Sequence, residues 1–442
     1  MKIYIVSAAY IASPRTQLSS HVIELTRELA KLGNEVIVLT MGFDDLSEEE
    51  IITLEDPFNT DVKKRKCSVK VYRFFVRDSN KIKSPFEGTK LEEIKRIEEF
   101  GNKAVKFLLS KKIKEKVIVH LHGHSIIPSF AKDLRKNENL IIVSSIHTFD
   151  SIAEAKKAED GAGPYIIEYL KEKEKQALEY SHTVIVRSKP VYDEISYIFP
   201  EVVNKQNIKI IPSGVSSVFI HYPHLSREEI EEVKREYKIK GKFIFMLNKL
   251  EPSKGIEYAL EAFNNINRKK IENVSMLIAG VFEKKNEWYL DRLKKYIKHK
   301  ELENYVKIKL DITEEDKIKL FNVADVFVLS SIIEPFGNTI IEALSKDVPV
   351  VISGVEGPKD IFNIERVKIP FTETDFGAVV FYDDPTKRAE FLSKAILKVL
   401  SENEKFKEKI KSKKEKIISK YNWEVLVNEK LKIYKHLLKS LR

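Results

Sequence analysis

Short apolar runs alternate with amphipathic stretches along most of the chain. The first three segments are "KIYIVSA" from residue 2, "SSHVIELTRELAKLG" from residue 19 and "EVIVLT" from residue 35. Apolar residues in the middle segment recur every three or four positions, as on one face of a helix, and Gly33 stands where such a helix would end. The flanking runs are rich in Ile and Val, which is typical of parallel strands covered on both faces. The pattern predicts a strand, a helix and a second parallel strand.

The same alternation continues in two series of similar length. Further strands are predicted near residues 69, 116, 140, 182 and 208, and then near residues 242, 274, 305, 326, 348 and 377. Two consecutive strand-helix series predict an α/β protein with two doubly wound, Rossmann-like domains. We place one domain at residues 1–205, a second at 206–420 and a C-terminal helix, 421–442, against the first domain. A ligand is expected in the cleft between the domains.

Composition narrows the class of protein without naming a ligand. Hydrophobic residues make up 43% and charged residues 33% of 442, which is ordinary for a globular chain, and the abundance of charge resembles that of thermophile proteins. No apolar run is long enough to cross a membrane. The net charge of +10 is spread along the chain; it fits solvated helix faces, but also phosphate-bearing ligands or an anionic membrane surface. A single cysteine, Cys67, excludes an intrachain disulfide and favours a cytoplasmic setting, with a peripheral contact at the inner face of the membrane as the alternative.

Lysines and exposed backbone amides follow two strands of the second series. Lys249 ends the strand near residue 242, and Lys254 precedes a glycine and a helix. In the stretch "SSIIEPFGNTIIEALS" from residue 330, Gly337, Asn338 and Thr339 stand at a helix start, where amides and the helix dipole favour an anion. Since the carboxyl ends of parallel strands meet at one edge of a sheet, these groups predict a diphosphate site.

Two carboxylates flank that helix start. Glu342, about one turn into the helix, could accept hydrogen bonds from a ribose diol, and Glu334, in the loop, could face a sugar hydroxyl. The alternative is that Glu342 is a solvated helix residue and Glu334 an acid favoured by the helix dipole. Spacing alone does not separate these readings.

The stretch from Glu334 to Glu342 resembles the signature of the large retaining, nucleotide-sugar-dependent glycosyltransferase family with the GT-B fold, in which two Glu residues eight positions apart surround a Phe-Gly pair. Three other segments are similar to motifs of that family: "IPSGVSSVF" from residue 211, "KLEPSKGIEYALEAF" from 249 and "YNWE" from 421. The resemblance is strongest over residues 205–442. It implies two Rossmann-like domains and transfer of a sugar, commonly a hexose, to an acceptor hydroxyl.

The resemblance also implies roles for individual residues. Lys249 and Lys254 would hold the donor diphosphate, Glu334 the donor sugar and Glu342 the ribose. The segment around Phe336, with the amides of Gly337 to Thr339, would contact the sugar and the phosphates. His147, in "SSIHTF", matches a family histidine that faces the reacting sugar from the first domain, so His147, Glu334 and Lys254 become the candidate catalytic residues; a lone histidine at a strand end is otherwise a structural one.

Several positions depart from the family pattern. The family's Arg is Lys249 here, which keeps the charge and loses the guanidinium fork. The Gly-Gly pair that usually approaches the donor phosphates is missing, and Arg15, Thr16 and Gln17 stand in its place. His182 replaces an Asp, while Glu174 keeps the acid that precedes it in the motif. The missing glycines leave donor geometry in the first domain open.

The sequence gives little support to a bound metal or to a macromolecular partner. His120, His122 and His124 alternate along one strand, and we read them as structural and not as a zinc site. No Asp-x-Asp pair occurs, which argues against a diphosphate-bound metal, so we expect neither a metal nor a cofactor beside the nucleotide sugar substrate. The acceptor is unknown, nucleic acid is not expected, and a peripheral membrane contact is the minor alternative for the amphipathic C-terminus. The rival functions are an α-glucan synthase and a non-catalytic protein that binds sugar nucleotides or nucleic acid.

Overall fold

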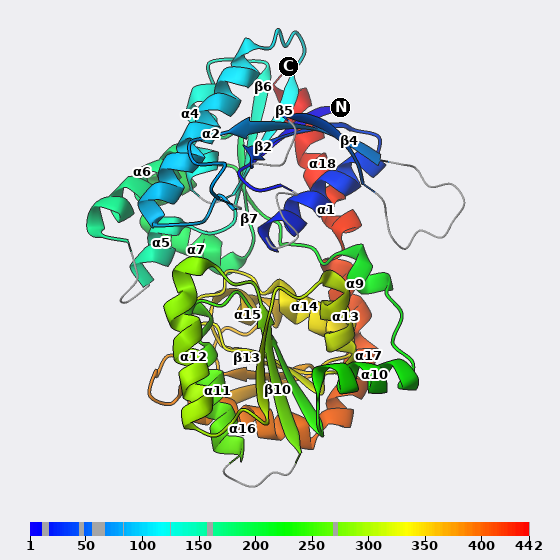
Figure 1. Cartoon of the computed structure of the whole chain (residues 1–442). Coiled ribbons are helices and arrows are strands. Elements are labelled where there is room, and N and C mark those ends of the chain that lie inside the picture. The colour runs from blue at the N-terminus through cyan, green and yellow to red at the C-terminus, as the bar shows by residue number, and fades with distance from the viewer. Residues whose placement is uncertain are drawn as a thin grey trace. The chain divides into compact units, whose positions relative to one another are not determined.

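The chain folds into two compact units, each built on one mainly parallel sheet. This computed structural model describes residues 1–10, 17–43, 48–54, 67–82, 84–123, 125–156, 162–267 and 273–441. The first unit comprises Met1–Ser216 with Asn422–Arg442, and the second comprises Ser217–Tyr421. In each unit, helices cover the faces of the sheet (Figure 1). The predicted α/β class with two doubly wound domains is confirmed.

The sheet of the first unit has eight strands in the order β3-β4-β2-β1-β5-β6-β7-β8. All neighbouring pairs are parallel except β3 with β4 at the edge. The strands are β1 (Lys2–Ser7), β2 (Glu35–Gly42), β3 (Glu49–Leu54), β4 (Cys67–Phe75), β5 (Val117–Gly123), β6 (Leu140–Ile146), β7 (Thr183–Val186) and β8 (Ile208–Ile210). The helices are α1 (Gln17–Lys31), α2 (Lys90–Ser110), α3 (Ile126–Ser129), α4 (Ala131–Leu134), α5 (Asp150–Lys156), α6 (Pro164–Tyr180), α7 (Lys189–Ile198), α8 (Pro200–Val203) and α18 (Trp423–Ser440).

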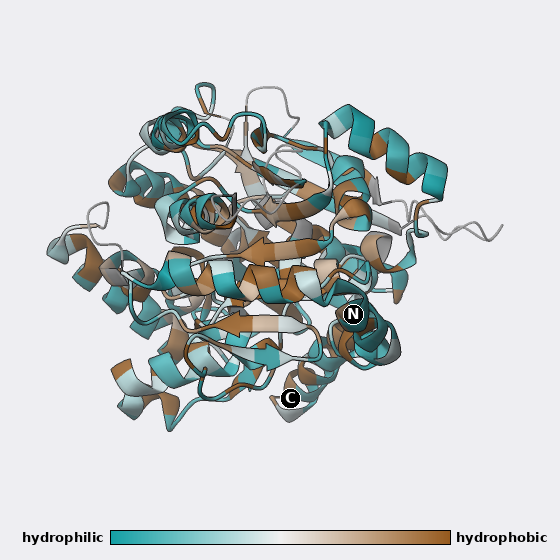
Figure 2. Cartoon of the chain, turned by 90° about the horizontal axis from the view of Figure 1, so that it is seen from below, coloured by the Kyte–Doolittle hydropathy of each residue, from teal (hydrophilic) through white to brown (hydrophobic). Residues whose placement is uncertain are grey.

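Strand β1 is continuously apolar because it supplies two separate cores. Tyr4 and Val6 face one side of the sheet, where they pack with residues of α2 and α3. Ile3 and Ile5 face the other side, where they pack with residues of α1 and α18. Figure 2 shows mainly brown strands and helices that mix teal and brown. Successive side chains of a strand point to opposite faces, so a sheet covered on both sides needs an unbroken apolar run.

The second unit has a seven-stranded sheet in the order β11-β10-β9-β12-β13-β15-β14. Its pairs are parallel except β14 with β15 at one edge. The strands are β9 (Lys242–Leu247), β10 (Val274–Gly280), β11 (Val306–Leu310), β12 (Val326–Leu329), β13 (Val350–Ser353), β14 (Phe371–Thr374) and β15 (Gly377–Val380). The helices are α9 (Ser217–His221), α10 (Arg227–Tyr237), η1 (Pro252–Lys254), α11 (Ile256–Asn267), η2 (Lys284–Asn286), α12 (Glu287–His299), α13 (Glu314–Val323), α14 (Asn338–Ser345), α15 (Glu356–Ile361), α16 (Arg388–Ser401) and α17 (Asn403–Lys420).

The strands predicted from apolar runs are all present, whereas the edge strands β3 and β14 were not predicted. Each of these two pairs antiparallel with the strand beside it. Their sequences, "EEIITL" and "FTET", mix polar and apolar residues, because an edge strand need not be buried on both faces. Among the described residues, no helix is both long and apolar enough to span a bilayer.

Glu174 of α6 is a buried carboxyl group that joins three segments of the first unit. Its oxygens accept hydrogen bonds from Ser125 Oγ (2.6 Å), Ser151 N (2.9 Å) and Ser151 Oγ (2.5 Å). Burial raises the pKa of Glu174 to about 7, because its effect is larger than that of these hydrogen bonds, which lower the pKa. The nearby charge of Asp150 raises the pKa further. The motif acid noted in the sequence therefore binds a proton more tightly in the folded chain than in the unfolded one.

We expect Glu174→Gln to remove a pH dependence of stability. Between the unfolded pKa of about 4.5 and the folded value of about 7, the folded chain holds the extra proton, so the free energy of unfolding falls as the pH rises. Between pH 4.5 and pH 7.5, the free energy of unfolding of the wild type should fall by on the order of 3 kcal/mol relative to that of the variant. Urea unfolding of both proteins at several pH values measures the difference, and a constant difference would contradict the prediction.

Candidate active site

Two loops of the second unit are tied together at the carboxyl ends of adjacent strands. One follows β9 and contains η1; the other follows β12 and leads into α14. Ser253 O accepts a hydrogen bond from Ile332 N (2.8 Å), and Ser330 Oγ donates to Gly255 O (2.9 Å). Gly255 adopts a left-handed conformation (φ +55°), and a Cβ there would lie 2.3 Å from Ser330 O. These contacts hold Lys254 of one loop against the other loop.

Lys254 and Glu334 form a mostly buried ion pair across these loops. Lys254 Nζ lies 3.1 Å from Glu334 Oε2, and the two side chains are 17% and 16% exposed. Burial works to lower the pKa of Lys254, but the charges of Glu334 and Glu251 outweigh burial, so the pKa lies above its usual value. The lysine is therefore a fixed positive charge.

Lys249 lies at the end of the same strand but faces other acids. Its Nζ is 2.7 Å from Glu283 Oε1 and 3.5 Å from Glu251 Oε2. The prediction that both lysines lie at this edge agrees with the structure. Lys249 is balanced by acids outside the loop of Glu334, so the two lysines have different immediate partners.

The start of α14 presents unused hydrogen-bonding groups. Gly337 caps the helix in a left-handed conformation (φ 98°), and Phe336 beside it is buried against Tyr421. Within the described part of the chain, the amides of Gly337, Asn338 and Thr339 donate no hydrogen bond. Asn338 Oδ1 is also buried and meets no hydrogen-bond partner among the described residues. Free amides at a helix start suit an anion or sugar oxygens.

Glu342 lies one turn into α14 and pairs with a lysine that the sequence did not single out. Lys317 Nζ, from α13, is 3.0 Å from Glu342 Oε1, and the Glu342 side chain is 12% exposed. Burial raises the pKa of Glu342, and the charge of Lys317, which lowers it, does not fully offset the effect of burial. Its second oxygen, Oε2, is buried with no hydrogen bond in the described chain. The reading of Glu342 as a solvated helix residue is therefore wrong, and one oxygen is free to accept a ligand hydroxyl.

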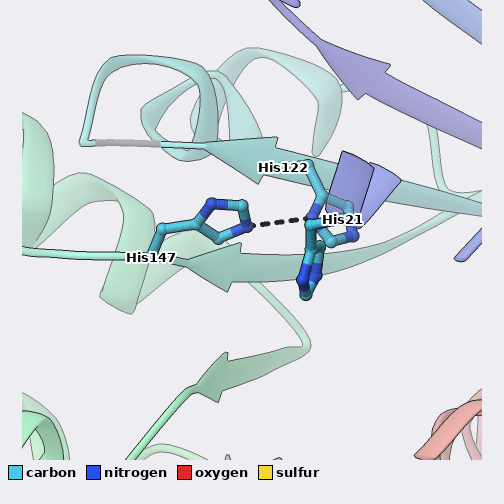
Figure 3. A group of neighbouring side chains, drawn as sticks. All are labelled: His21, His122 and His147. Atoms are coloured by element: carbon cyan, nitrogen blue, oxygen red, sulfur yellow. Dashed lines mark hydrogen bonds between the residues drawn. The ribbon is translucent and has the colours of Figure 1, made fainter. Parts of the chain in front are cut away.

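In the first unit, His147 directly follows β6 and lies in a group of three buried histidines (Figure 3). His147 Nε2 is 3.3 Å from His122 Nδ1, and the ring of His21 lies 5.0 Å from that of His147. His122 and His147 both line a cavity whose other walls are mainly apolar. From the sequence, only His147 was a candidate catalytic residue and His122 was read as structural; His21, on α1, approaches them only through the fold.

Of the three histidines that the sequence predicted along one strand, the two on β5, His120 and His122, have different partners. His120 is fully satisfied, with Nε2 2.7 Å from Ser145 Oγ and Nδ1 bonded to the hydroxyl of Tyr434. His122 instead joins His21 and His147, while His124 lies outside the described residues. Arg15 and Thr16, which stand in place of the Gly-Gly pair, are likewise outside them, as is the side chain of Gln17.

Comparisons with known proteins match both units. The model of the family "Glycosyltransferase Family 4" matches residues 18–218, and that of "Glycosyl transferases group 1" matches residues 227–417. A probable sucrose-phosphate synthase of Thermosipho melanesiensis is 27% identical over 63% of this chain and 60% of its own length. An uncharacterized glycosyltransferase of Methanocaldococcus jannaschii is 28% identical over 59% of this chain and 62% of its own. The alignments thus span about three fifths of each relative.

Solved structures with the same fold cover nearly the whole chain. Sucrose-phosphate synthase from Thermosynechococcus elongatus has a TM-score of 0.76 at 18% identity and covers 99% of both chains. A trehalose-phosphate synthase from Burkholderia xenovorans, in complex with glucose-6-phosphate, has a TM-score of 0.71 at 12% identity, over 98% of this chain and 100% of the other. Anabaena HepE, in complex with UDP and glucose, has a TM-score of 0.67 at 16% identity, over 98% of each chain.

Proposed function

This chain belongs to the GT-B glycosyltransferases, and from that premise we propose that it transfers a hexosyl group from a nucleoside diphosphate sugar to an acceptor hydroxyl, with retention of anomeric configuration. The observation that carries the proposal is the arrangement of Lys254 with the nine residues from Glu334 to Glu342 in the second unit. Glu334 pairs with Lys254. Among the residues that the structure describes, the amides at 337–339 donate no hydrogen bond and one buried oxygen of Glu342 has no partner.

Each group suits one part of such a donor. The amides of Gly337 to Thr339 and the charge of Lys254 would hold the diphosphate, since both favour an anion. Glu342 Oε2 would accept a hydrogen bond from a ribose hydroxyl, which would satisfy its unpaired oxygen. Glu334 would accept from a hydroxyl of the sugar while still paired with Lys254. His147 would face the reacting sugar from the first unit.

The transfer itself requires little acid-base chemistry from the protein. The bond between the anomeric carbon and the diphosphate oxygen breaks, and the acceptor oxygen forms its bond to that carbon on the same face. The acceptor proton passes to the departing diphosphate, whose charge Lys254 and the amides stabilise. No metal is needed in this scheme, because a lysine and helix amides supply the positive charge. The neighbours bound to UDP and to glucose-6-phosphate support a nucleotide donor and a sugar acceptor.

We expect one nucleoside diphosphate to stabilise the chain against heat, and Glu342→Ala to abolish the effect. The nucleotide that binds is found from a panel of UDP, GDP, ADP and their sugar conjugates. At about 100 times its dissociation constant it should add about 2.7 kcal/mol of stability, or roughly 5 to 10 °C in the Tm of a unit the size of Ser217–Tyr421. Glu315→Ala is the matched control, because Glu315 is an exposed acid of α13 paired with Lys319. It should keep the full shift.

The result also separates the rival functions. No shift with any nucleotide would contradict a nucleotide-sugar enzyme, and steeply salt-dependent nucleic-acid binding would then favour the non-catalytic alternative. A sugar-nucleotide-binding protein without activity would show the shift but release no nucleotide from the sugar conjugate when acceptors are added. Elongation of an α-glucan, and of no smaller acceptor, would favour the α-glucan synthase.

A further inference from the structure

Lys317, on α13, is a mostly buried lysine beside Glu342 of the proposed donor site. Its side chain is 14% exposed, and its Nζ lies 3.0 Å from Glu342 Oε1 on α14 and 3.0 Å from Glu314 Oε1 on its own helix. The same Nζ lies 4.4 Å from the centroid of the Phe219 ring on α9. Helices α9, α13 and α14 lie together in the second unit (Figure 1). Groups from all three helices thus hold this lysine.

These contacts account for every hydrogen of the ammonium group. A lysine ammonium carries three N–H donors. Two are matched by the carboxylates of Glu342 and Glu314, and the aromatic face of Phe219 attracts the remaining side. Burial works to lower the pKa of Lys317, but the charges of Glu342 and Glu314 outweigh burial, so the pKa lies above its usual value. Lys317 is therefore a permanent cation that acts on a ligand through Glu342.

Glu342 depends on this cation to stay ionised. Its side chain is 12% exposed, and burial raises its pKa. The charge of Lys317 and the hydrogen bond from it lower that pKa, whereas the charge of Glu314 raises it. Without the lysine, both burial and Glu314 would favour the neutral, protonated carboxyl group.

The unpaired oxygen of Glu342 argues against a purely structural ion pair. Among the described residues, Oε2 is buried with no hydrogen-bond partner, although Oε1 is paired with Lys317. Leaving a buried oxygen unpaired costs stability, and a buried ion pair alone is weak evidence of a stabilising role. A carboxylate that is charged, fixed at one oxygen and unpaired at the other suits a hydroxyl group that arrives with a ligand.

The same helix carries the amides proposed for the diphosphate. From Asn338, at the start of α14, to Glu342 the helix advances by four residues, which is about 6 Å along its axis. The ribose of a nucleotide spans a comparable length between its diphosphate and its hydroxyl groups. One nucleotide can therefore meet both the amides and Oε2.

We propose that Lys317 is a positioning residue of the donor site: it keeps Glu342 ionised and holds Oε1, so that Oε2 accepts a ribose hydroxyl and the site selects ribonucleotides over deoxyribonucleotides. This inference rests on the proposed function, since it requires a nucleotide donor. A hydrogen bond to a charged acceptor is stronger than one to a neutral carboxyl group. A deoxynucleotide leaves Oε2 buried and unpaired, and a site built to bind a hydroxyl group rejects such an analogue.

The first test measures ribose selection in the wild-type chain. Calorimetric titration at pH 8 compares the nucleoside diphosphate that stabilises the chain, found among UDP, GDP and ADP, with its 2′-deoxy and 3′-deoxy forms. We expect at least one deoxy form to bind about tenfold more weakly, or more weakly still. Equal affinity for all three forms would overturn the inference.

The second test compares Lys317→Met with Lys319→Met, a control whose lysine pairs with Glu315 on the same helix. At pH 8, Lys317→Met should weaken binding of the ribonucleotide by about tenfold and leave binding of the deoxy form within about twofold of wild type. Lys319→Met should change neither affinity. An equal loss for both forms, or no loss, would show a structural lysine and contradict the proposal.

The pH profile of ribose selection is a readout that a structural role would not move. Selection requires ionised Glu342, so it is present above the pKa of this group and is lost as the pH falls through that pKa. Removal of Lys317 raises the pKa of Glu342. The pH at which half of the selection is lost should therefore rise by about one unit or more in Lys317→Met. An unchanged midpoint would count against the proposal.

A double variant covers the loss of stability that Lys317→Met brings, because that change leaves a buried carboxylate without its cation. Lys317→Met/Glu342→Gln has no charge at either position of the pair. It should bind the ribonucleotide and the deoxy form weakly and with equal affinity at every pH. Selection that survives in the double variant would exclude the pair from ribose recognition.

Failure of this inference and failure of the proposed function give different results. Nucleotide binding by the wild type, with ribose selection intact in Lys317→Met, refutes the inference and leaves the proposed function standing. Absence of binding by any nucleoside diphosphate refutes both.

Discussion

Replacing Lys254 with methionine is expected to reduce kcat/KM for sugar transfer by about three orders of magnitude. Removal of one preorganised group that stabilises charge in a transition state costs about 10²–10³ in rate, and Lys254 would meet the full charge of the leaving diphosphate. The pKa of Lys254 lies above its usual value, so the charge is present throughout the working pH range. Steady-state kinetics on purified wild type and variant measure the effect.

Two further variants separate catalysis from stability. Lys254→Met leaves Glu334 mostly buried without its partner, which costs about 3 kcal/mol of stability. The double variant Lys254→Met/Glu334→Gln should recover most of that stability and none of the activity. Lys394→Met, which removes an exposed lysine paired with Glu390, is the matched control and should keep full activity. Lys254→Met activity within tenfold of wild type would exclude this lysine from charge stabilisation.

Gly357→Ala is expected to abolish donor binding through the backbone alone. A Cβ at Gly357 would lie 2.3 Å from Phe336 Cα and 2.4 Å from Phe336 N, and Gly357 N donates a hydrogen bond to Glu334 O (2.9 Å). Main-chain atoms cannot turn aside as a flexible side chain can, so the loop from Glu334 to Gly337 must shift. A misplacement of about 1 Å costs about 10² in rate.

The measurements for this variant are nucleotide affinity, kcat/KM and far-UV circular dichroism. We expect affinity to fall at least 100-fold while the spectrum stays that of a folded protein. Gly163→Ala is the control, because a Cβ at Gly163, before α6, would meet no atom within 4 Å. Normal affinity in Gly357→Ala would mean that the loop can move without harm, and the proposed role of its amides would then be wrong.

Local patterns were sufficient to predict the strands and the loop groups of the second unit. Lys254 and Glu334 lie in the loops that follow β9 and β12, which pair directly, so parallel topology alone brings these loops together. Lys317 could not be found that way. It lies on α13, among charged residues of a helix whose sequence does not show that this lysine turns toward Glu342.

The group formed by His21, His122 and His147 was largely hidden because it joins residues from distant parts of the chain. His21 reaches His122 only when α1 packs on the sheet, and no spacing in the sequence records that contact. A local sign did exist for Lys430, a buried lysine of α18. It falls between Leu426, Val427 and Tyr434 on the apolar stripe of α18, where a lysine is out of place.

The substitution of His182 for an acid could be seen but not interpreted from sequence. His182 Nδ1 accepts a hydrogen bond from Ile142 N (2.9 Å) at the start of β6. Burial, and then the charge of Arg135, lower the pKa of His182 to about 4, so the ring is neutral at pH 7 and Nδ1 can accept. The histidine thus accepts from a backbone amide, as a carboxylate there would, without introducing a negative charge.

The return of α18 to the first unit has a consequence for synthesis on the ribosome. The second unit is one continuous segment, Ser217–Tyr421, whereas the first unit needs residues from Asn422 onward. Until those residues emerge, the face formed by Val22, Leu25 and Leu29 lacks Leu426, Val427 and Tyr434, which pack with it in the finished core. The nascent chain must therefore carry an open apolar surface through the whole translation of the second unit. The part made first is the last to be completed, and it is the part that a chaperone would have to shield.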